Sequence, residues 1–234
     1  MTNDKYEITD IAHPEYPWLH RIRALQDVGK DVKKGDLGGY VESESNLSFE
    51  PKDNAWLFDD SIACNTAYVC QDSCLYKKSM AKDKAYISKG SSMSGSSIVE
   101  DDAMIQGASL YGNARISGTA LSSRSGYRPT ISGDESVYGL ICGNFHLDGQ
   151  TVILEGEKLY NQRDDRIILS NGIRYVLSDE AKQSPEVHPK AGQRHGTSCT
   201  AESRKCFARK RILLHRQGQG SSRSHSCSTD GLAF

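Results

Sequence analysis

Residues 53–123 read, in successive groups, DNAWLF, DDSIAC, NTAYVC, QDSCLY, KKSMAK, DKAYIS, KGSSMS, GSSIVE, DDAMIQ, a five-residue GASLY, GNARIS and GTALSS. The third position of every group is Ala or Ser, from Ala55 to Ala120. The fifth position is apolar in eleven of the twelve groups, and the exception is Ser122. This period matches neither the turn of a helix nor the simple alternation of an isolated strand.

A short strand followed by a tight corner explains the spacing, because two positions of each group then point inward. The aliphatic fifth position fills the interior, and the next Ala or Ser lies just past the corner, where only a small side chain fits. The first two positions are rich in Gly, Asn and Asp, which tolerate unusual backbone angles. Three groups close one triangular coil of eighteen residues. The sequence therefore predicts an all-β, single-stranded parallel β-solenoid.

Charged residues eighteen apart provide a second indication of this stacking, since they should lie about 4.8 Å apart on neighbouring coils. The offset predicts four opposite-charge pairs: Asp59 with Lys77, Asp60 with Lys78, Lys82 with Glu100, and Lys84 with Asp102. Asp83 over Asp101 is a like-charge pair and counts against a perfect pattern. We interpret the lysines from Lys77 to Lys89 as a solvated face paired with acids, with a phosphate or nucleic-acid patch as the alternative.

The same rhythm predicts a solenoid over residues 37–156. Its first coil begins near Leu37, and the phase breaks at 49–52 and again at 121–130, which we interpret as loops. The rhythm then returns imperfectly through Val137, Leu147 and Ile153, with glycines at the corners.

Both open ends of a solenoid have to be closed, because an exposed core and bare strand edges favour aggregation. We expect residues 1–36 to form an N-terminal β cap, in which Ile22 and Ala24 face inward. Residues 157–179 are expected to form a C-terminal hairpin cap, because Asn171-Gly172 between two apolar runs is a strong type I′ hairpin signal.

Residues 180–234 differ from the rest of the chain in charge and pattern. They hold ten Lys/Arg against four Asp/Glu, whereas the first 179 residues hold nineteen against twenty-six. Neither a helical nor a strand period is sustained there, so we expect a disordered basic tail. Its alternatives are a nucleic-acid-binding tail and an extension not shaped by folding, and few aromatic residues are present for base stacking.

Composition also bears on location. No apolar run approaches the ~20 residues of a membrane span, and the start of the chain lacks the apolar core of a signal peptide. The odd number of cysteines, seven, favours reduced thiols over a disulfide framework. We therefore expect a cytoplasmic protein that does not enter a membrane.

The repeat resembles that of the hexapeptide-repeat superfamily, in which an aliphatic residue is followed four positions later by a small one. Examples here are Leu57 with Ser61, Val69 with Ser73, Ile87 with Ser91, and Val99 with Ala103. The resemblance implies a left-handed β-helix, an exception to the usual right-handed crossover.

A more specific resemblance covers about residues 5–155. The segments RIRAL, GDLGGYVE and NLS, followed at once by the six-residue groups, look like the YdcK-like β-solenoid family, which is common in enterobacterial genomes and prophages. Family members are often labelled acetyltransferases on kinship of fold, and that label is an analogy of fold.

Acyl transfer is the chemistry that this resemblance implies. Hexapeptide acyltransferases typically form trimers, bind coenzyme A in a groove between solenoids and use a histidine as general base. His146 is the candidate base, because it lies between Phe145 and inward-facing Leu147 and should point outward. Arg124, Tyr127 and Arg128, in the predicted loop, are the candidate cofactor-binding residues and would reach a neighbouring subunit. The alternative for His146 is an ordinary surface histidine, since no motif ties it to an acid.

Other catalytic and metal signatures are missing from the sequence. Cys64, Cys70 and Cys74 should lie on different faces of the coil, so they do not converge as a tetrahedral zinc site requires. The chain has no P-loop, no GxSxG, no HExxH and no GxGxxG after a strand. We therefore predict no metal site and no required cofactor.

Three functions follow, in order of preference. The first is a non-catalytic solenoid scaffold, phage- or prophage-derived, that binds a protein partner or itself, with a homotrimer as one possible assembly. The second is a coenzyme-A-dependent acetyltransferase with a trimeric site around His146. The third is nucleic-acid binding through the basic tail, which we favour least.

Overall fold

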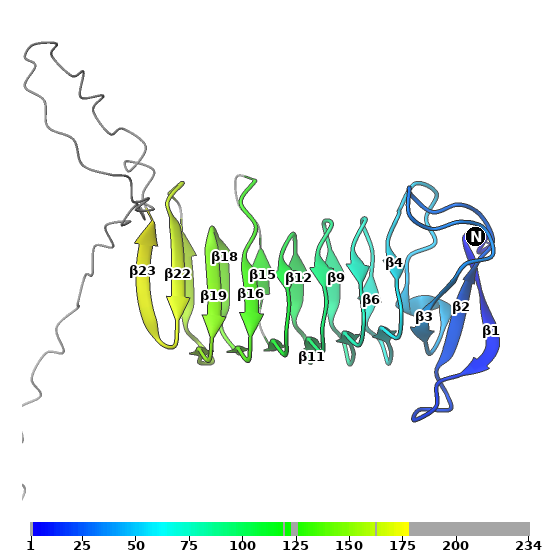
Figure 1. Cartoon of the computed structure of the whole chain (residues 1–234), viewed down its shortest axis with the longest axis horizontal. Helices are drawn as coiled ribbons and strands as arrows, with labels where there is room; N and C mark the ends of the chain where they lie inside the picture. The colour runs from blue at the N-terminus through cyan, green and yellow to red at the C-terminus, as the bar shows by residue number, and fades with distance from the viewer. Residues whose placement is uncertain (1, 119, 123–125, 162, 178–234) are drawn as a thin grey trace, which may run out of the picture.

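The computed structural model describes residues 2–118, 120–122, 126–161 and 163–177. These residues wind into an elongated parallel β-solenoid whose short strands stack along the long axis of the molecule (Figure 1). The predicted all-β solenoid is therefore confirmed. Within the described residues the strands form three sheets, of nine, eight and six strands.

The nine-stranded sheet begins with three antiparallel strands and continues with parallel ones. In spatial order its strands are β1 (Tyr6–Ala12), β2 (His20–Ala24), β3 (Leu37–Val41), β5 (Ile62–Ala63), β8 (Met80–Ala81), β11 (Ile98–Glu100), β14 (Arg115–Ser117), β17 (Ser136–Val137) and β20 (Val152–Ile153). A 3₁₀ turn, η1 (Glu44–Asn46), follows β3.

The other two sheets form the remaining sides of the coil. The eight-stranded sheet consists of β4 (Trp56–Leu57), β7 (Cys74–Leu75), β10 (Ser92–Met93), β13 (Ser109–Leu110), β16 (Thr130–Gly133), β19 (Phe145–Gly149), β22 (Arg166–Ser170) and β23 (Ile173–Leu177). The six-stranded sheet consists of β6 (Tyr68–Val69), β9 (Tyr86–Ser88), β12 (Met104–Gln106), β15 (Ala120–Ser122), β18 (Leu140–Gly143) and β21 (Lys158–Asn161).

The core consists of the two inward positions that the repeat predicts. Every third-position side chain from Ala55 to Ala114 is at most 1% exposed, and every fifth-position side chain from Leu57 to Ile116 is fully buried. In the early coils, residues eighteen apart are register partners, for example Trp56 with Cys74. The predicted inward positions and the stacking offset are therefore confirmed over this region.

The last group of the repeat was assigned in the wrong phase. Ala120 pairs with Met104, and Leu121 pairs with Ile105, so Leu121 rather than Ser122 occupies the fifth position. Leu121 is fully buried. The group that starts at Gly118 is one residue short, which the sequence concealed because its Ala and Ser fit either phase.

From Asp59 onward, corners of the coil use the left-handed backbone conformation at the first position of each group. The non-glycine residues at this position, such as Asp59 and Lys77, have φ between +53° and +58°. The corners around Gly112 require glycine for a second reason, because a Cβ there would lie 2.9 Å from the backbone nitrogen of Gly133 on the next coil. Adjacent coils are in direct contact at this corner.

Two of the four predicted charge pairs form and two do not. Lys82 lies 2.8 Å from Glu100, and Lys84 lies 3.3 Å from Asp102. Asp60 instead pairs with Arg21 of the N-terminal cap, at 2.5 Å.

Asp59 accepts a hydrogen bond from the backbone nitrogen of Lys77, at 2.9 Å, where a side-chain pair was predicted. The same arrangement explains the like-charge stack, because the carboxylate of Asp83 accepts the backbone N–H of Asp101. A corner Asp thus contacts the main chain of the next coil, so its role does not depend on the sign of the residue above it.

At the N-terminal end, the antiparallel strands β1, β2 and β3 cover the first coil (Figure 1). Ile22 and Ala24 are buried, as predicted. Lys5 is 2% exposed, and its Nζ donates to the carbonyl oxygens of Ser48 and Ala55, each at 2.8 Å. An ammonium group therefore satisfies main-chain carbonyls that the end of the solenoid would otherwise leave unpaired.

At the C-terminal end, parallel stacking continues beyond the predicted limit at residue 156. β21 pairs in parallel with β18, and β22 pairs in parallel with β19. The predicted hairpin is confirmed at β22 and β23, where Asn171 and Gly172 both have positive φ, as a type I′ turn requires. The predicted tail, residues 180–234, lies outside the described residues. No helix in the described part of the chain has the length and hydropathy needed to cross a membrane.

Candidate functional site

His146 lies on the outer face of β19, between the buried side chains of Phe145 and Leu147. Its register partners are Thr130 on β16 and Ile168 on β22. The side chain is half-buried and is covered from one side. It is therefore less accessible than a solvent-facing surface histidine.

Arg166 provides that cover. Its Nη2 donates to Thr130 Oγ1 at 3.3 Å, two strands away, so the arginine crosses β19 at the level of His146. Burial lowers the pKa of His146, the Arg166 charge lowers it further, and the Asp148 carboxylate opposes both effects. The imidazole is consequently favoured in its neutral form.

A neutral imidazole has the protonation state of a general base, but its orientation is not fixed here. His146 Nδ1 is buried and has no hydrogen-bond partner among the described residues. Arg166 Nε is in the same situation. A catalytic histidine usually needs a partner on one nitrogen that selects its tautomer and aims the other nitrogen. Within the described residues His146 lacks this feature.

The predicted loop residues are not brought to His146. Arg124 lies outside the described residues, and Tyr127 is 36% exposed. Arg128 Nη2 donates to the carbonyl oxygens of Lys89, at 3.2 Å, and of Gly90. Because Lys89 and Gly90 precede β10, Arg128 points along the sheet away from β19. It holds a corner of its own solenoid.

The three clustered cysteines lie on three sides of the coil. Cys64 follows β5, Cys70 follows β6 and Cys74 is in β7, so they belong to different sheets. Burial raises the pKa of each thiol, for Cys64 to about 11. The part of the chain that the structure describes contains no cluster of three or more His, Cys, Asp or Glu placed to hold a metal ion.

A row of large apolar side chains runs along the outer face of the six-stranded sheet. Tyr68 pairs with Tyr86, and Tyr86 pairs with Met104. Leu140 lies on the same side, two strands beyond Met104, and Ala120 of β15 occupies the register position between them. The Tyr68 and Tyr86 rings lie 6.0 Å apart, and Cys70 Sγ donates to Tyr86 OH at 3.4 Å. We call these four residues, Tyr68, Tyr86, Met104 and Leu140, the outer row.

The outer faces of the other two sheets differ from this one. On the eight-stranded sheet the equivalent column is small or polar in its middle, and it runs through Trp56, Cys74, Ser92, Ser109, Thr130, His146 and Ile168. On the nine-stranded sheet Tyr40 and Ile62 are apolar but buried, because Tyr16 and Leu19 of the N-terminal cap pack on them. The same column continues through half-buried Met80 and Ile98 and becomes polar at Arg115 and Ser136. The outer row is thus one of two outer columns with several apolar side chains, and Met104 within it is 42% exposed.

The outer row was not predicted from the sequence. Its signal was present, because Tyr68, Tyr86 and Met104 occupy the fourth position of every third group. Fourth positions of successive groups lie on three different faces of the coil. The apolar residues of one face are therefore recognised only when residues eighteen apart are compared.

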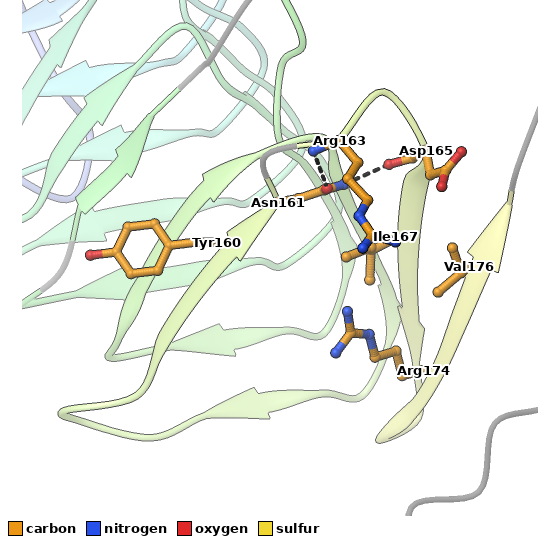
Figure 2. Close-up of a pocket in the computed structure, with 7 residues that line it drawn as sticks. All are labelled: Tyr160, Asn161, Arg163, Asp165, Ile167, Arg174 and Val176. Carbon is orange, nitrogen blue, oxygen red and sulfur yellow. Dashed lines mark hydrogen bonds between the residues drawn. The ribbon is translucent and has the colours of Figure 1, made fainter.

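A pocket of about 400 Å³ lies at the C-terminal end, between β21 and the hairpin of β22 and β23 (Figure 2). It was not predicted from the sequence. Seven residues line it: Tyr160, Asn161, Arg163, Asp165, Ile167, Arg174 and Val176. It combines two arginines with an apolar wall.

Comparison with known proteins adds no assignment. No protein-family model matches the chain, and no curated protein matches it. The resemblance to the YdcK-like family, and the left-handed coil that the hexapeptide-repeat resemblance implies, stay predictions.

Proposed function

We propose that this protein is a non-catalytic solenoid scaffold that binds a protein partner along the outer row. The observation that carries the proposal is the in-register series of Tyr68, Tyr86 and Met104 on the six-stranded sheet. Aromatic residues and methionine are enriched at the centres of protein interfaces, where they bury large areas at low entropic cost.

The stiffness of the solenoid supports this role. Interior side chains are fully buried over many successive coils, and each coil hydrogen-bonds to the next. The spacing of the outer-row side chains is therefore fixed before a partner binds, which reduces the entropy lost on binding. A phage or prophage origin, implied by the family resemblance, remains part of the proposal.

Acetyl transfer receives less support. Among the described residues, His146 has no hydrogen-bonding acid and Arg166 crosses above it. The Arg128 guanidinium donates to the carbonyl oxygens of Lys89 and Gly90, away from His146. A coenzyme A site would then have to be assembled from a neighbouring subunit and from Arg124.

The test compares full-length wild-type protein with Met104→Glu and with Val152→Glu as a matched control. Val152 is 55% exposed on the nine-stranded sheet, so its substitution adds the same charge away from the outer row. A partner captured by the wild-type protein is purified and titrated against all three. We expect Met104→Glu to weaken binding at least about tenfold, because a buried methionine contributes about 1.5–3 kcal/mol. Val152→Glu should bind normally.

Equal binding by both variants would exclude the outer row as the interface. Analytical ultracentrifugation of the same proteins shows whether the partner is a second copy of the chain. Acetyl-CoA should leave the melting temperature unchanged. A rise that His146→Ala abolishes would replace the scaffold with an acyltransferase.

A further inference from the structure

An arginine continues a row of inward-facing aliphatic side chains at the C-terminal end. In the eight-stranded sheet Leu110, Ile131, Leu147 and Leu169 are successive register partners. The next partner, across the hairpin, is Arg174. Residues directly opposite in an antiparallel pair project from the same face of the sheet. Arg174 therefore extends from the core side of β23, over the open end of the solenoid.

Arg163 brings a second cation to the same place. It follows β21 in a loop that Asn161 holds from inside. Asn161 is 6% exposed, and its Nδ2 donates to the carbonyl oxygens of Asn144, at 2.9 Å, and Asp165, at 2.6 Å. Its Oδ1 accepts the backbone N–H of Arg163 at 3.0 Å. The base of the Arg163 side chain is therefore fixed by a buried amide.

Figure 2 shows the guanidinium groups of Arg163 and Arg174 entering one space beside Ile167. The carboxylate of Asp165, the acidic residue of the lining, is directed away from them (Figure 2). The structure records no ion pair for either arginine among the described residues. Two like charges directed into one partly apolar space repel each other, and an anion between them would remove the repulsion.

We propose that this pocket binds a small ligand with an oxyanion head, a phosphate or a carboxylate, on a compact apolar body. Paired guanidinium groups match such a head, because each presents a planar fork of donors. Ile167 is 5% exposed and, with Val176, forms an apolar wall for the body. The volume, about 400 Å³, lies within the range of small-molecule sites.

Isothermal titration of the full-length protein tests the proposal with four probes. These are inorganic phosphate, phenyl phosphate, benzoate and phenol. Phenyl phosphate should bind more tightly than inorganic phosphate, because it also fills the apolar wall. Benzoate distinguishes a carboxylate head from a phosphate head. Phenol, which lacks the charge, should not bind measurably.

Arg163→Gln and Arg174→Gln should each weaken phenyl phosphate binding about tenfold or more, since a hydrogen bond to a charged group is removed. Lys158→Gln is the matched control. Lys158 is exposed on β21 and does not line the pocket. Its replacement by Gln removes one positive charge, as each arginine substitution does. It should leave affinity within about twofold.

Arg174→Lys keeps the charge and loses the fork, so it should bind with intermediate affinity. Circular dichroism of Arg174→Lys and Arg174→Gln shows whether either variant has a folding defect. The proposal is overturned if no anionic probe binds the wild-type protein, or if the arginine variants bind as well as Lys158→Gln.

Discussion

The two ends of the solenoid are closed to very different degrees. At the N-terminal end, Tyr6 and Trp56 are each 1% exposed, with their rings in an edge-to-face arrangement and centroids 6.3 Å apart. At the C-terminal end the core side of the last strands is open among the described residues, because Val176 is 42% exposed and the pocket of about 400 Å³ extends to Ile167. Apolar side chains that are at least 42% exposed occur at both ends, among them Ile11, Trp18 and Leu37 in the N-terminal cap.

The difference comes from how each cap meets the core. The N-terminal strands extend the nine-stranded sheet and also place side chains across the end of the coil. Tyr6 OH reaches the carbonyl oxygen of Leu47 at 2.9 Å, and Lys5 reaches those of Ser48 and Ala55. The C-terminal hairpin extends the eight-stranded sheet alone. Antiparallel pairing protects a strand edge, but only side chains laid across the coil close its core.

The largest expected change in the free energy of unfolding is at the N-terminal end. Trp56→Ala should lower the free energy of unfolding by about 3–5 kcal/mol, because it leaves a cavity against Tyr6 and the first coil. Ile173→Ala, at a side chain 49% exposed, should change it by less than about 0.5 kcal/mol. Urea denaturation followed by circular dichroism measures both. Similar losses at the two positions would contradict the comparison.

A second test concerns the buried ammonium of the closed end. Burial lowers the pKa of Lys5 to about 8 in the folded protein, from an ordinary value of 10.5. Between these values the unfolded chain binds more protons, so stability should rise with pH. From pH 7 to about 9.5, wild-type protein should gain roughly 2 kcal/mol relative to Lys5→Met.

The control for this test is Lys34→Met, which removes an exposed lysine from the same cap. The wild-type protein should show no comparable gain against it, since the Lys34 side chain stays exposed to water on folding. A flat difference between wild type and Lys5→Met would show that the amine is not desolvated.

The repeat predicts the inward positions of the solenoid well. Inward positions were predicted correctly because a narrow triangular coil admits only Ala or Ser near a corner and an aliphatic residue mid-face. The repeat therefore records the steric constraint many times over. The phase failed only at Gly118–Leu121, where one residue is missing and no single residue marks the loss.

Contacts between distant segments were predicted poorly. Asp60 meets Arg21 rather than Lys78, because the N-terminal cap folds back onto the second coil. Arg166 covers His146 because a strand twenty residues later lies beside β19. Neither arrangement follows from the period, since each depends on where a non-repeating segment lies.

The pocket at the open end shows the same limit. Ile173 to Leu177 alternate without a clear polar face, so the sequence did not reveal that Arg174 points to the core side. Only the register of the hairpin, which pairs Leu169 with Arg174, decides the matter.

The smallest expected change in stability concerns two corner residues, one at each end of the solenoid. At the closed end, Asp53 accepts three backbone N–H groups, from Ala55 at 2.9 Å, Gln71 at 2.7 Å and Asp72 at 2.8 Å. At the open end, Asn171 Oδ1 accepts the backbone N–H of Gln150 at 3.1 Å. Asp53→Asn should lower stability by about 1 kcal/mol at neutral pH, because one charged acceptor becomes a donor. Asn171→Gly should change it by less than about 0.5 kcal/mol, since glycine suits the positive φ.

The pH dependence separates the two corners further. Burial alone would raise the pKa of Asp53, but the hydrogen bonds that it accepts hold the pKa below its ordinary value of 3.8. Its stabilisation is therefore present above that value and is lost as the pH falls through the folded pKa. The difference between wild type and Asp53→Asn should shrink in acid, whereas the difference for Asn171→Gly should not move, because neither residue titrates. A constant difference for Asp53→Asn would mean that the carboxylate charge contributes nothing, and that the two ends differ in packing alone.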